Sequence, residues 1–373
     1  MDLIPVSRPW LGDTELAAVK EVFDSCWLGM GAQVFAFEQE LARFLGAKNV
    51  ICTNTGTTAL HLALDALGIG KGDEVVVPSL TYVATIQAIT ATGARPVFCD
   101  IRDQDLNMDV DDAAGRITSR TRAILPVHYR GFPCDLAAIY DLACDRDLFV
   151  VEDAAHAFGS SYQGKKIGSF QSIACFSFDP IKNITCGEGG AIVFQDPELL
   201  PVLQQKRILG IDKDTWTRYR NERSWFYDVV TQGYRYHMPN INAAIGLEQL
   251  KKFAVMNQDK IRVARAYDAA FRDCAGITLL EDRGYEDIGL FAYILRVHAG
   301  RNELMDYLGK NGVGSGVHYI PSHLFTFHHQ ADLTLPVTER VYNEILSLPL
   351  FAGMSAPQVD RVTSSVREWI GKA

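Results

Sequence analysis

The feature that most constrains this fold is an alternation of short apolar segments with helix-like segments over the first half of the chain. The strand-like segments are residues 50–53, 74–78, 96–100, 123–127, 148–152, 173–177 and 190–194, and helical patterns at 59–67 and 82–92 lie among them. Strands that are apolar almost throughout are buried on both faces, as in parallel sheets covered by helices. The alternation therefore predicts an α/β domain with a mostly parallel sheet.

The pattern changes after about residue 195. Residues 206–227 are rich in Arg, Trp and Tyr without clean periodicity, which predicts a long excursion of a functional or mobile kind. Helical patterns at 241–258 and 261–274, a strand-like run at 289–297 and further helices at 301–311 and after residue 355 predict a smaller α+β unit. We therefore expect a large domain over residues 1–245, including an N-terminal helix and the excursion, and a small domain over residues 246–373.

Composition excludes several classes of protein. The 373 residues are 48% hydrophobic with a net charge of −9, which disfavours a nucleic-acid surface. No apolar run approaches the roughly 18–20 residues of a membrane span, and the N-terminal residues lack a signal core, so a cytoplasmic location is expected. The eight cysteines form no C-x-x-C pair, which predicts buried reduced thiols rather than disulfides or a zinc site.

Lys182 is the strongest candidate for chemistry. It follows the apolar strand that ends at Ser177 and precedes the flexible turn Gly187-Glu-Gly-Gly190. A lysine nucleophile must be neutral part of the time, so it needs a desolvated setting of this kind. The alternative is a solvated loop lysine.

Asp153 directly follows the strand 148–152, and His156 lies three residues later. In open α/β sheets the carboxyl ends of strands line the ligand crevice. An acid that pairs with a pyridine nitrogen, together with a lysine that forms an imine, is what a protein supplies to pyridoxal phosphate. A helix cap is the alternative for Asp153, and simple packing for His156.

The segment 54–58 joins a predicted strand to a predicted helix, whose free backbone N–H groups would attract a phosphate. The amides of Gly56 and Thr57 and the hydroxyls of Thr57 and Ser177 are the candidates, with ordinary turn and cap chemistry as the alternative. Tyr82 begins the next helix and offers a ring to stack on a pyridine, or simply to pack. His318 and Tyr319 form a polar aromatic cluster with His323; without acid or cysteine ligands we expect no metal there.

Seven motifs in order resemble the DegT/DnrJ-type sugar-nucleotide aminotransferases. They are Gly56-Thr57-x-Ala59-Leu60, Glu152-Asp-Ala-Ala-His156, Phe176-Ser-Phe-x-Pro-x-Lys182-Asn183, Gly187-Glu-Gly-Gly190, the run 233–247, His318-Tyr319-x-Pro321-x-His323 and Leu346-Ser-Leu-Pro-Leu350. The resemblance covers essentially the whole chain. It implies a fold-type I enzyme with a seven-stranded mixed sheet, a small C-terminal domain, and a homodimer with active sites at the subunit boundary.

The resemblance also assigns roles. Lys182 is the Schiff-base lysine, Asp153 pairs with the pyridine nitrogen and His156 lies near the ring. Further cofactor contacts are expected from Gly56, Thr57, Tyr82, Ser177 and Asn183. Many relatives have Asn in the motif G-Y-N-Y-R, which reaches the phosphate from the neighbouring subunit. This chain has Arg235 at that position, and its guanidinium would contact the same phosphate or a substrate diphosphate. Substrate contacts are expected from His318 and Tyr319, and from Arg207 and Arg220, with Arg218 and Arg223 nearby, which are candidates for binding the substrate diphosphate. A solvated basic loop is the alternative for these arginines.

The implied reaction moves an amino group from L-glutamate to a nucleotide-linked keto-deoxysugar, for surface polysaccharide or secondary metabolite synthesis. The N-terminal segment 4–16 is more similar to enzymes that act at C4 than at C3. Relatives that dehydrate their sugar carry His where this chain has Lys182, so transamination is favoured. The alternatives are another pyridoxal phosphate reaction, such as dehydration or elimination, and a non-catalytic regulator with the same fold.

Overall fold

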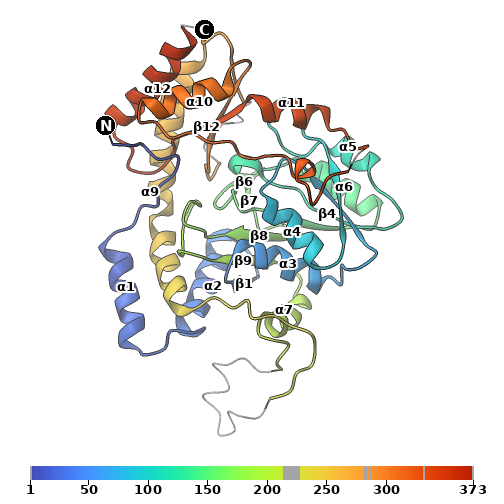
Figure 1. Ribbon diagram of the computed structural model, residues 1–373. Coiled ribbons are helices and arrows are strands. Elements are labelled where there is room, and N and C mark those ends of the chain that lie inside the picture. Colours follow the sequence, from blue (N-terminus) through green and yellow to red (C-terminus); the bar gives the residue numbers. More distant parts are fainter. Residues whose placement is uncertain (1, 213–226, 281–283, 286, 331, 372–373) are drawn as a thin grey trace.

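A seven-stranded sheet forms the centre of the computed structural model, which describes residues 2–212, 227–280, 284–285, 287–330 and 332–371 (Figure 1). Its strands are β1 (Asn49–Thr53), β2 (Glu74–Pro78), β3 (Arg95–Cys99), β4 (Thr121–Ile124), β5 (Phe149–Asp153), β8 (Ile173–Ser177) and β9 (Gly190–Phe194). The order is β1-β9-β8-β5-β4-β2-β3; β9 runs antiparallel to both of its neighbours, and the other neighbouring pairs are parallel. The predicted α/β fold with a mostly parallel sheet is thereby confirmed.

Helices cover both faces of this sheet. The first half of the chain supplies α1 (Asp13–Asp24), α2 (Ala32–Leu45), α3 (Gly56–Ala66), α4 (Val83–Ala91), α5 (Val110–Gly115), α6 (Leu136–Asp145) and α7 (Leu199–Arg207). Alternate residues of a strand enter different cores: Val75 and Val77 pack with α3 and α4, whereas Val76 packs with α5 and α6. This two-sided burial explains why the strands are continuously apolar, since each buried valine contributes about 1.5–3 kcal/mol.

A second, three-stranded antiparallel sheet lies in the C-terminal part. Its strands are β10 (Ile277–Leu279), β11 (Tyr293–Val297) and β12 (Ile345–Leu348), and its helices are α10 (Arg301–Lys310), α11 (Pro336–Glu344) and α12 (Ala356–Ile370). Ile4 is buried in the core of this unit and pairs with Val313. The first residues of the chain therefore pack with the C-terminal unit, although they lie within the predicted large domain.

One long helix joins the two parts. Helix α9 runs from Asn240 to Phe271 as 32 continuous residues, along one side of the molecule from the large sheet to the C-terminal unit (Figure 1). The predicted break between residues 258 and 261 is wrong, because the buried face continues through Met256, Lys260 and Val263. The boundary predicted after residue 245 falls inside this helix, and a division at that point stays a prediction.

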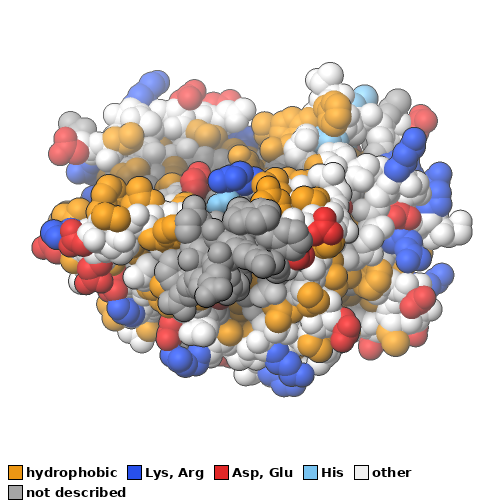
Figure 2. Space-filling view, turned by 90° about the horizontal axis from the view of Figure 1, so that it is seen from below, with side chains coloured by type: hydrophobic (Ala, Val, Ile, Leu, Met, Phe, Trp, Pro, Cys, Tyr) orange, Lys and Arg blue, Asp and Glu red, His pale blue; other side chains and the backbone are white. Residues whose placement is uncertain are grey.

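The predicted excursion begins later than expected, because Lys206 and Arg207 form the last turn of α7. Residues 213–226 lie outside the described residues. The face below α7 carries interspersed acidic, basic and hydrophobic side chains rather than one basic patch (Figure 2). No described helix is both long enough and apolar enough to cross a bilayer.

Candidate active site

Three strands end at one edge of the large sheet and bring the predicted site residues together. β1 ends at Thr53, β5 at Asp153 and β8 at Ser177, and α3 and α4 begin beside them. Between them lies a cavity of about 310 Å³. Its walls include Gly56, Thr57, Tyr82, Asp153, His156, Ser177, Lys182 and Tyr319. The crevice predicted at the carboxyl ends of the strands is therefore present in this molecule.

Lys182 lies in the loop between β8 and β9. Asp179 shapes this loop, since its side chain accepts the Ile181 N–H (3.0 Å) and its carbonyl accepts the Lys182 N–H (3.0 Å). The Lys182 Nζ lies 4.6 Å from the centroid of the Phe291 ring. Burial lowers the pKa of Lys182 to about 8, against the opposing effects of Asp153 and Asp179. A substantial neutral fraction near neutral pH is what a lysine nucleophile needs.

Asp153 is 6% exposed and is held by two donors. The Thr85 hydroxyl donates to Oδ2 (2.6 Å), and the Ala155 N–H donates to Oδ1 (3.0 Å). Thr85 in turn bonds the Thr81 hydroxyl (2.8 Å). Sequence reasoning missed Thr85; its only signal was the i, i+4 spacing of the two threonines at the start of the predicted helix. These bonds fix the carboxylate at the wall of the cavity.

Glu152, in the same motif as Asp153, bonds groups away from this cavity. Its carboxylate is fully buried and is bonded by His128 Nε2 (2.7 Å), the Tyr140 hydroxyl (2.7 Å) and the Ser172 hydroxyl. These bonds lower the pKa of Glu152 against the effect of burial. Glu152 is therefore a structural acid within β5.

His156 lies between two aromatic side chains. Its ring stacks on Phe291, with centroids 3.9 Å apart and planes 7° apart, and its Nε2 is 2.9 Å from the Tyr319 hydroxyl. Burial and the charge of Lys182 lower the pKa of His156 well below its usual value, so the imidazole is neutral. The buried Nδ1 has no hydrogen-bond partner among the described residues. The sequence predicts Phe291 only as part of a strand-like run and gives no sign of its contact with His156.

The predicted phosphate position is a close contact between α3 and β8. Thr55 caps α3 by accepting the Thr58 N–H (3.1 Å), which leaves Gly56 and Thr57 in the first turn. A Cβ on Gly56 would lie 2.7 Å from the Ser177 Cβ, so only glycine permits this approach. A Cβ on Gly190 would lie 2.3 Å from the Thr55 carbonyl oxygen. Main-chain donors and the Ser177 hydroxyl can therefore converge on one small anion.

Tyr82 is the N-cap residue of α4, and its side chain is 55% exposed at the cavity. Its ring centroid lies 5.4 Å from that of Tyr319. The predicted stacking of Tyr82 on a pyridine stays a prediction.

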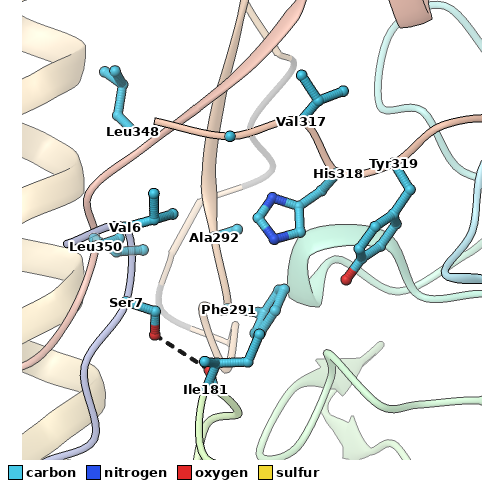
Figure 3. Close-up of a pocket in the computed structure, with 11 residues that line it drawn as sticks. Val6, Ser7, Ile181, Phe291, Ala292, Val317, His318, Tyr319, Leu348 and Leu350 are labelled. Carbon is cyan, nitrogen blue, oxygen red and sulfur yellow. Dashed lines mark hydrogen bonds between the residues drawn. The ribbon is translucent and has the colours of Figure 1, made fainter. Parts of the chain in front are cut away.

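A second cavity, of about 400 Å³, lies beyond Tyr319 and Ile181 (Figure 3). Its walls are mostly apolar and come from β12, the segment before β11 and the N-terminal residues Val6 and Ser7. His318 points into it, with Nδ1 2.6 Å from the Ser347 hydroxyl. Burial and the charge of Lys182 lower the pKa of His318 to about 4, so this imidazole is neutral too.

Asn183 does not line the cavity between Asp153 and Lys182, contrary to the prediction of a cofactor contact. Its Nδ2 donates to the carbonyls of His156 (3.2 Å), Phe158 (3.0 Å) and Gly289 (2.9 Å). The Asn183 side chain therefore holds the backbone of these three residues together.

Arg207 also corrects a prediction. Its side chain is buried, and Nη1 donates to Glu38 Oε1 and to the Cys52 carbonyl (3.0 Å). A guanidinium enclosed between α2 and β1 cannot contact a substrate diphosphate. Arg220, with Arg218 and Arg223, lies outside the described residues.

Replacing Arg207 with methionine is expected to lower the free energy of unfolding by about 3–5 kcal/mol, because the Glu38 carboxylate, only 11% exposed, would lose its cation. The matched control is Lys206→Met, which breaks the partly exposed pair with Asp65 and should cost about 0–1 kcal/mol. Denaturant unfolding of both variants checks the difference. A raised KM for the sugar substrate with unchanged stability would restore the substrate role of Arg207.

Arg235 is exposed on a short bridge to Ile208. Its neighbours Tyr234 and Tyr236 pack inward on His61, with ring centroids 4.9 and 5.8 Å away. Because side chains alternate along an extended segment, Arg235 lies on the side opposite to these tyrosines and is exposed. It does not line the cavity that contains Lys182.

The residues present fit pyridoxal phosphate. The unpartnered Nδ1 of His156 is available to a polar group of a ligand, and the glycine-dependent contact at Gly56 and Ser177 suits a phosphate. Asp153 and Lys182 line the same cavity as these groups. Within the described residues no group of three or more His, Cys, Asp or Glu side chains is placed to hold a metal ion.

Comparisons with known proteins agree with this geometry. Residues 9–367 match the model of the DegT/DnrJ/EryC1/StrS aminotransferase family. The chain is 38% identical over 377 residues to the spore coat polysaccharide biosynthesis protein SpsC of Bacillus subtilis, covering 98% of this chain and 96% of that protein. The aminotransferase TlmJ of Streptoalloteichus hindustanus has a TM-score of 0.93 at 34% identity, with 99% of both chains covered.

Spr1654 of Streptococcus pneumoniae, assigned as a sugar aminotransferase, has a TM-score of 0.92 at 30% identity in its pyridoxal phosphate form, with 99% of each chain covered. The chain therefore belongs to the DegT/DnrJ/EryC1/StrS aminotransferase family and is a pyridoxal phosphate-dependent sugar aminotransferase.

Proposed function

We propose that this enzyme transfers the amino group of L-glutamate to the keto group of a nucleotide-linked deoxysugar, with a C4 keto group favoured over C3. The observation that carries the proposal is the pair of adjoining cavities that share Ile181 and Tyr319. One holds Lys182 and Asp153, and the other offers an apolar space for a sugar. The N-terminal segment on which the C4 preference rests supplies Val6 and Ser7 to the wall of the second cavity.

The roles of the residues follow from their positions. Bound pyridoxal phosphate supplies an electron sink for breaking a C–H bond of the amino donor. Lys182 holds the cofactor and, once released, moves the proton as base and acid, which its lowered pKa favours. Asp153 keeps the pyridine nitrogen protonated. His156 stays neutral and lies near the ring, while Gly56, Thr57 and Ser177 hold the phosphate.

Neutral His318 and Tyr319 would orient the sugar from the second cavity. His318 can hydrogen-bond a hydroxyl or keto oxygen without adding a charge. The name of SpsC supports a place in polysaccharide synthesis, and we propose an amino sugar destined for a surface polysaccharide or a secondary metabolite as the product.

A screen of nucleotide-linked 4-keto and 3-keto deoxysugars with L-glutamate tests the function. We expect an amino sugar by mass spectrometry, with one 2-oxoglutarate released for each product. Consumption of the keto sugar without 2-oxoglutarate would indicate dehydration or elimination instead. Amination of 3-keto sugars alone would overturn the C4 preference.

We further propose a homodimer in which Arg235 reaches the phosphate or the substrate diphosphate of the neighbouring subunit. Its exposed position, with its flanking tyrosines packed inward, supports this role. A heterodimer of Arg235→Ala and Lys182→Ala subunits, purified through two different tags, would then contain one intact site. It should recover about half of the wild-type activity, since a two-fold dimer has two equivalent sites. No recovery would mean that Arg235 acts within its own subunit.

A further inference from the structure

A second buried lysine lies beneath the loop that carries Lys182. Lys260 is in the middle of α9 and is 7% exposed, and no carboxylate of the described residues pairs with it. Its Nζ donates to Asn183 Oδ1 (3.2 Å) and to the Leu290 carbonyl. Burial lowers its pKa to about 7. A lysine kept in the interior without an acid is costly, which calls for a reason beyond packing.

The bond from Lys260 completes the hydrogen-bond network of the Asn183 amide. The other partners of this amide are all carbonyl groups, those of His156, Phe158 and Gly289, so they require the NH₂ group. Lys260 is the donor on the opposite side and requires the oxygen. With both requirements met, only one of the two amide orientations satisfies every group.

The segments held in this way are those that surround the Lys182 side chain. Asn183 is the next residue after Lys182, and it bonds the backbone of His156. Gly289 and Leu290, bonded by Asn183 and Lys260, lead directly to Phe291. Phe291 stacks on His156 and lies 4.6 Å from the Lys182 Nζ. One polar cluster thus ties together three segments that are far apart in the sequence.

We infer that Lys260 is a positioning residue for catalysis. It acts through Asn183 to hold Lys182, His156 and Phe291 in their positions relative to one another. The inference rests on Lys182 as the cofactor's lysine, but it does not depend on which sugar is aminated. Without Lys260, Asn183 Oδ1 and the Leu290 carbonyl lose their buried donor, so the loop loosens and water reaches Lys182. A displacement of about 1 Å at a reacting group can cost about 100-fold in rate.

The test measures Lys182 in the apoprotein, where neither cofactor nor substrate is needed. In Lys260→Met, the pH dependence of Lys182 labelling by an amine-reactive reagent, followed by peptide mass spectrometry, should show its pKa rising from about 8 towards its usual 10.5. In the loaded enzyme, kcat should fall by about 10–100-fold. Lys251→Met is the matched control, because Lys251 is exposed on the same helix, and it should change neither quantity.

A double-mutant cycle with Asn183→Ala distinguishes positioning from a purely structural role. If Lys260 acts through Asn183, the double variant should resemble either single variant in kcat and in the pKa of Lys182. Additive losses, or an unchanged pKa of Lys182 in Lys260→Met, would overturn the inference. Should Lys260→Met not fold, Asn183→Ala alone decides: a raised pKa of Lys182 supports the inference, and an unchanged one refutes it.

Discussion

Replacing Lys182 with alanine is expected to abolish turnover, with a fall in kcat of at least about 10⁴-fold, because both covalent attachment of the cofactor and proton transfer are lost. The visible absorbance of the lysine-bound cofactor should disappear at the same time. Lys165→Ala, at an exposed lysine of the short strand β7 (Lys165–Lys166), is the matched control. Wild-type turnover in the Lys182 variant would remove the assignment.

The same substitution has a consequence for stability in the apoprotein. The pKa of Lys182 is lowered to about 8 from 10.5, so between these values the unfolded chain binds more protons than the folded chain. The stability of the wild type relative to Lys182→Ala should therefore rise as pH increases from about 8 to about 10.5. Denaturant unfolding at several pH values measures this, and a flat difference would mean that Lys182 is solvated.

Asp153→Asn is expected to lower kcat by about 10²–10⁴-fold, since a neutral amide cannot keep the pyridine nitrogen protonated. The substitution preserves shape: the amide oxygen can accept the Ala155 N–H, and the Thr85 hydroxyl can accept from the amide NH₂. Cofactor binding should consequently change much less than the rate.

Thr85→Val serves as the comparison for this variant, because it removes one bond to the carboxylate and keeps the charge. We expect a loss of about 10-fold, in line with one hydrogen bond to a charged group. Rates for both variants in a single turnover with glutamate decide the point. An Asp153→Asn rate within threefold of the wild type would show that the carboxylate only caps the following turn.

The central residues of the site could be predicted because the ends of apolar strands can be located in the sequence. Asp153 and Ser177 each close an apolar run, and Gly56 begins the helix after a third run, so a parallel sheet must bring them to one edge. Lys182 was found for the same reason, through the turn that joins β8 to β9. The order and periodicity of the apolar segments were therefore enough to predict the fold of the large domain and the location of the cavity.

Other features depend on partners far along the chain. The burial of Arg207 depends on Glu38, 169 residues earlier, whereas its place in the predicted excursion suggests exposure. Asn183 beside Lys182 reads as a cofactor contact, but Gly289 and Lys260 direct its amide away from the cavity. No local sequence pattern predicts that Phe291 stacks on His156. The contact between Arg207 and Glu38 joins two helices of the large part, whereas the contacts of Gly289, Lys260 and Phe291 arise from packing between the two parts of the molecule.

The continuity of α9 bears on how this enzyme can be recombined with its relatives. The helix begins at Asn240, near the large sheet, carries Lys260 beneath the Lys182 loop and ends at Phe271 in the C-terminal core. A chimera of two relatives joined at residue 245 would have its junction within the second turn of α9. An exchanged unit that keeps α9 whole begins before Asn240, and it takes with it the first residues of the chain, because Ile4 packs into the same core.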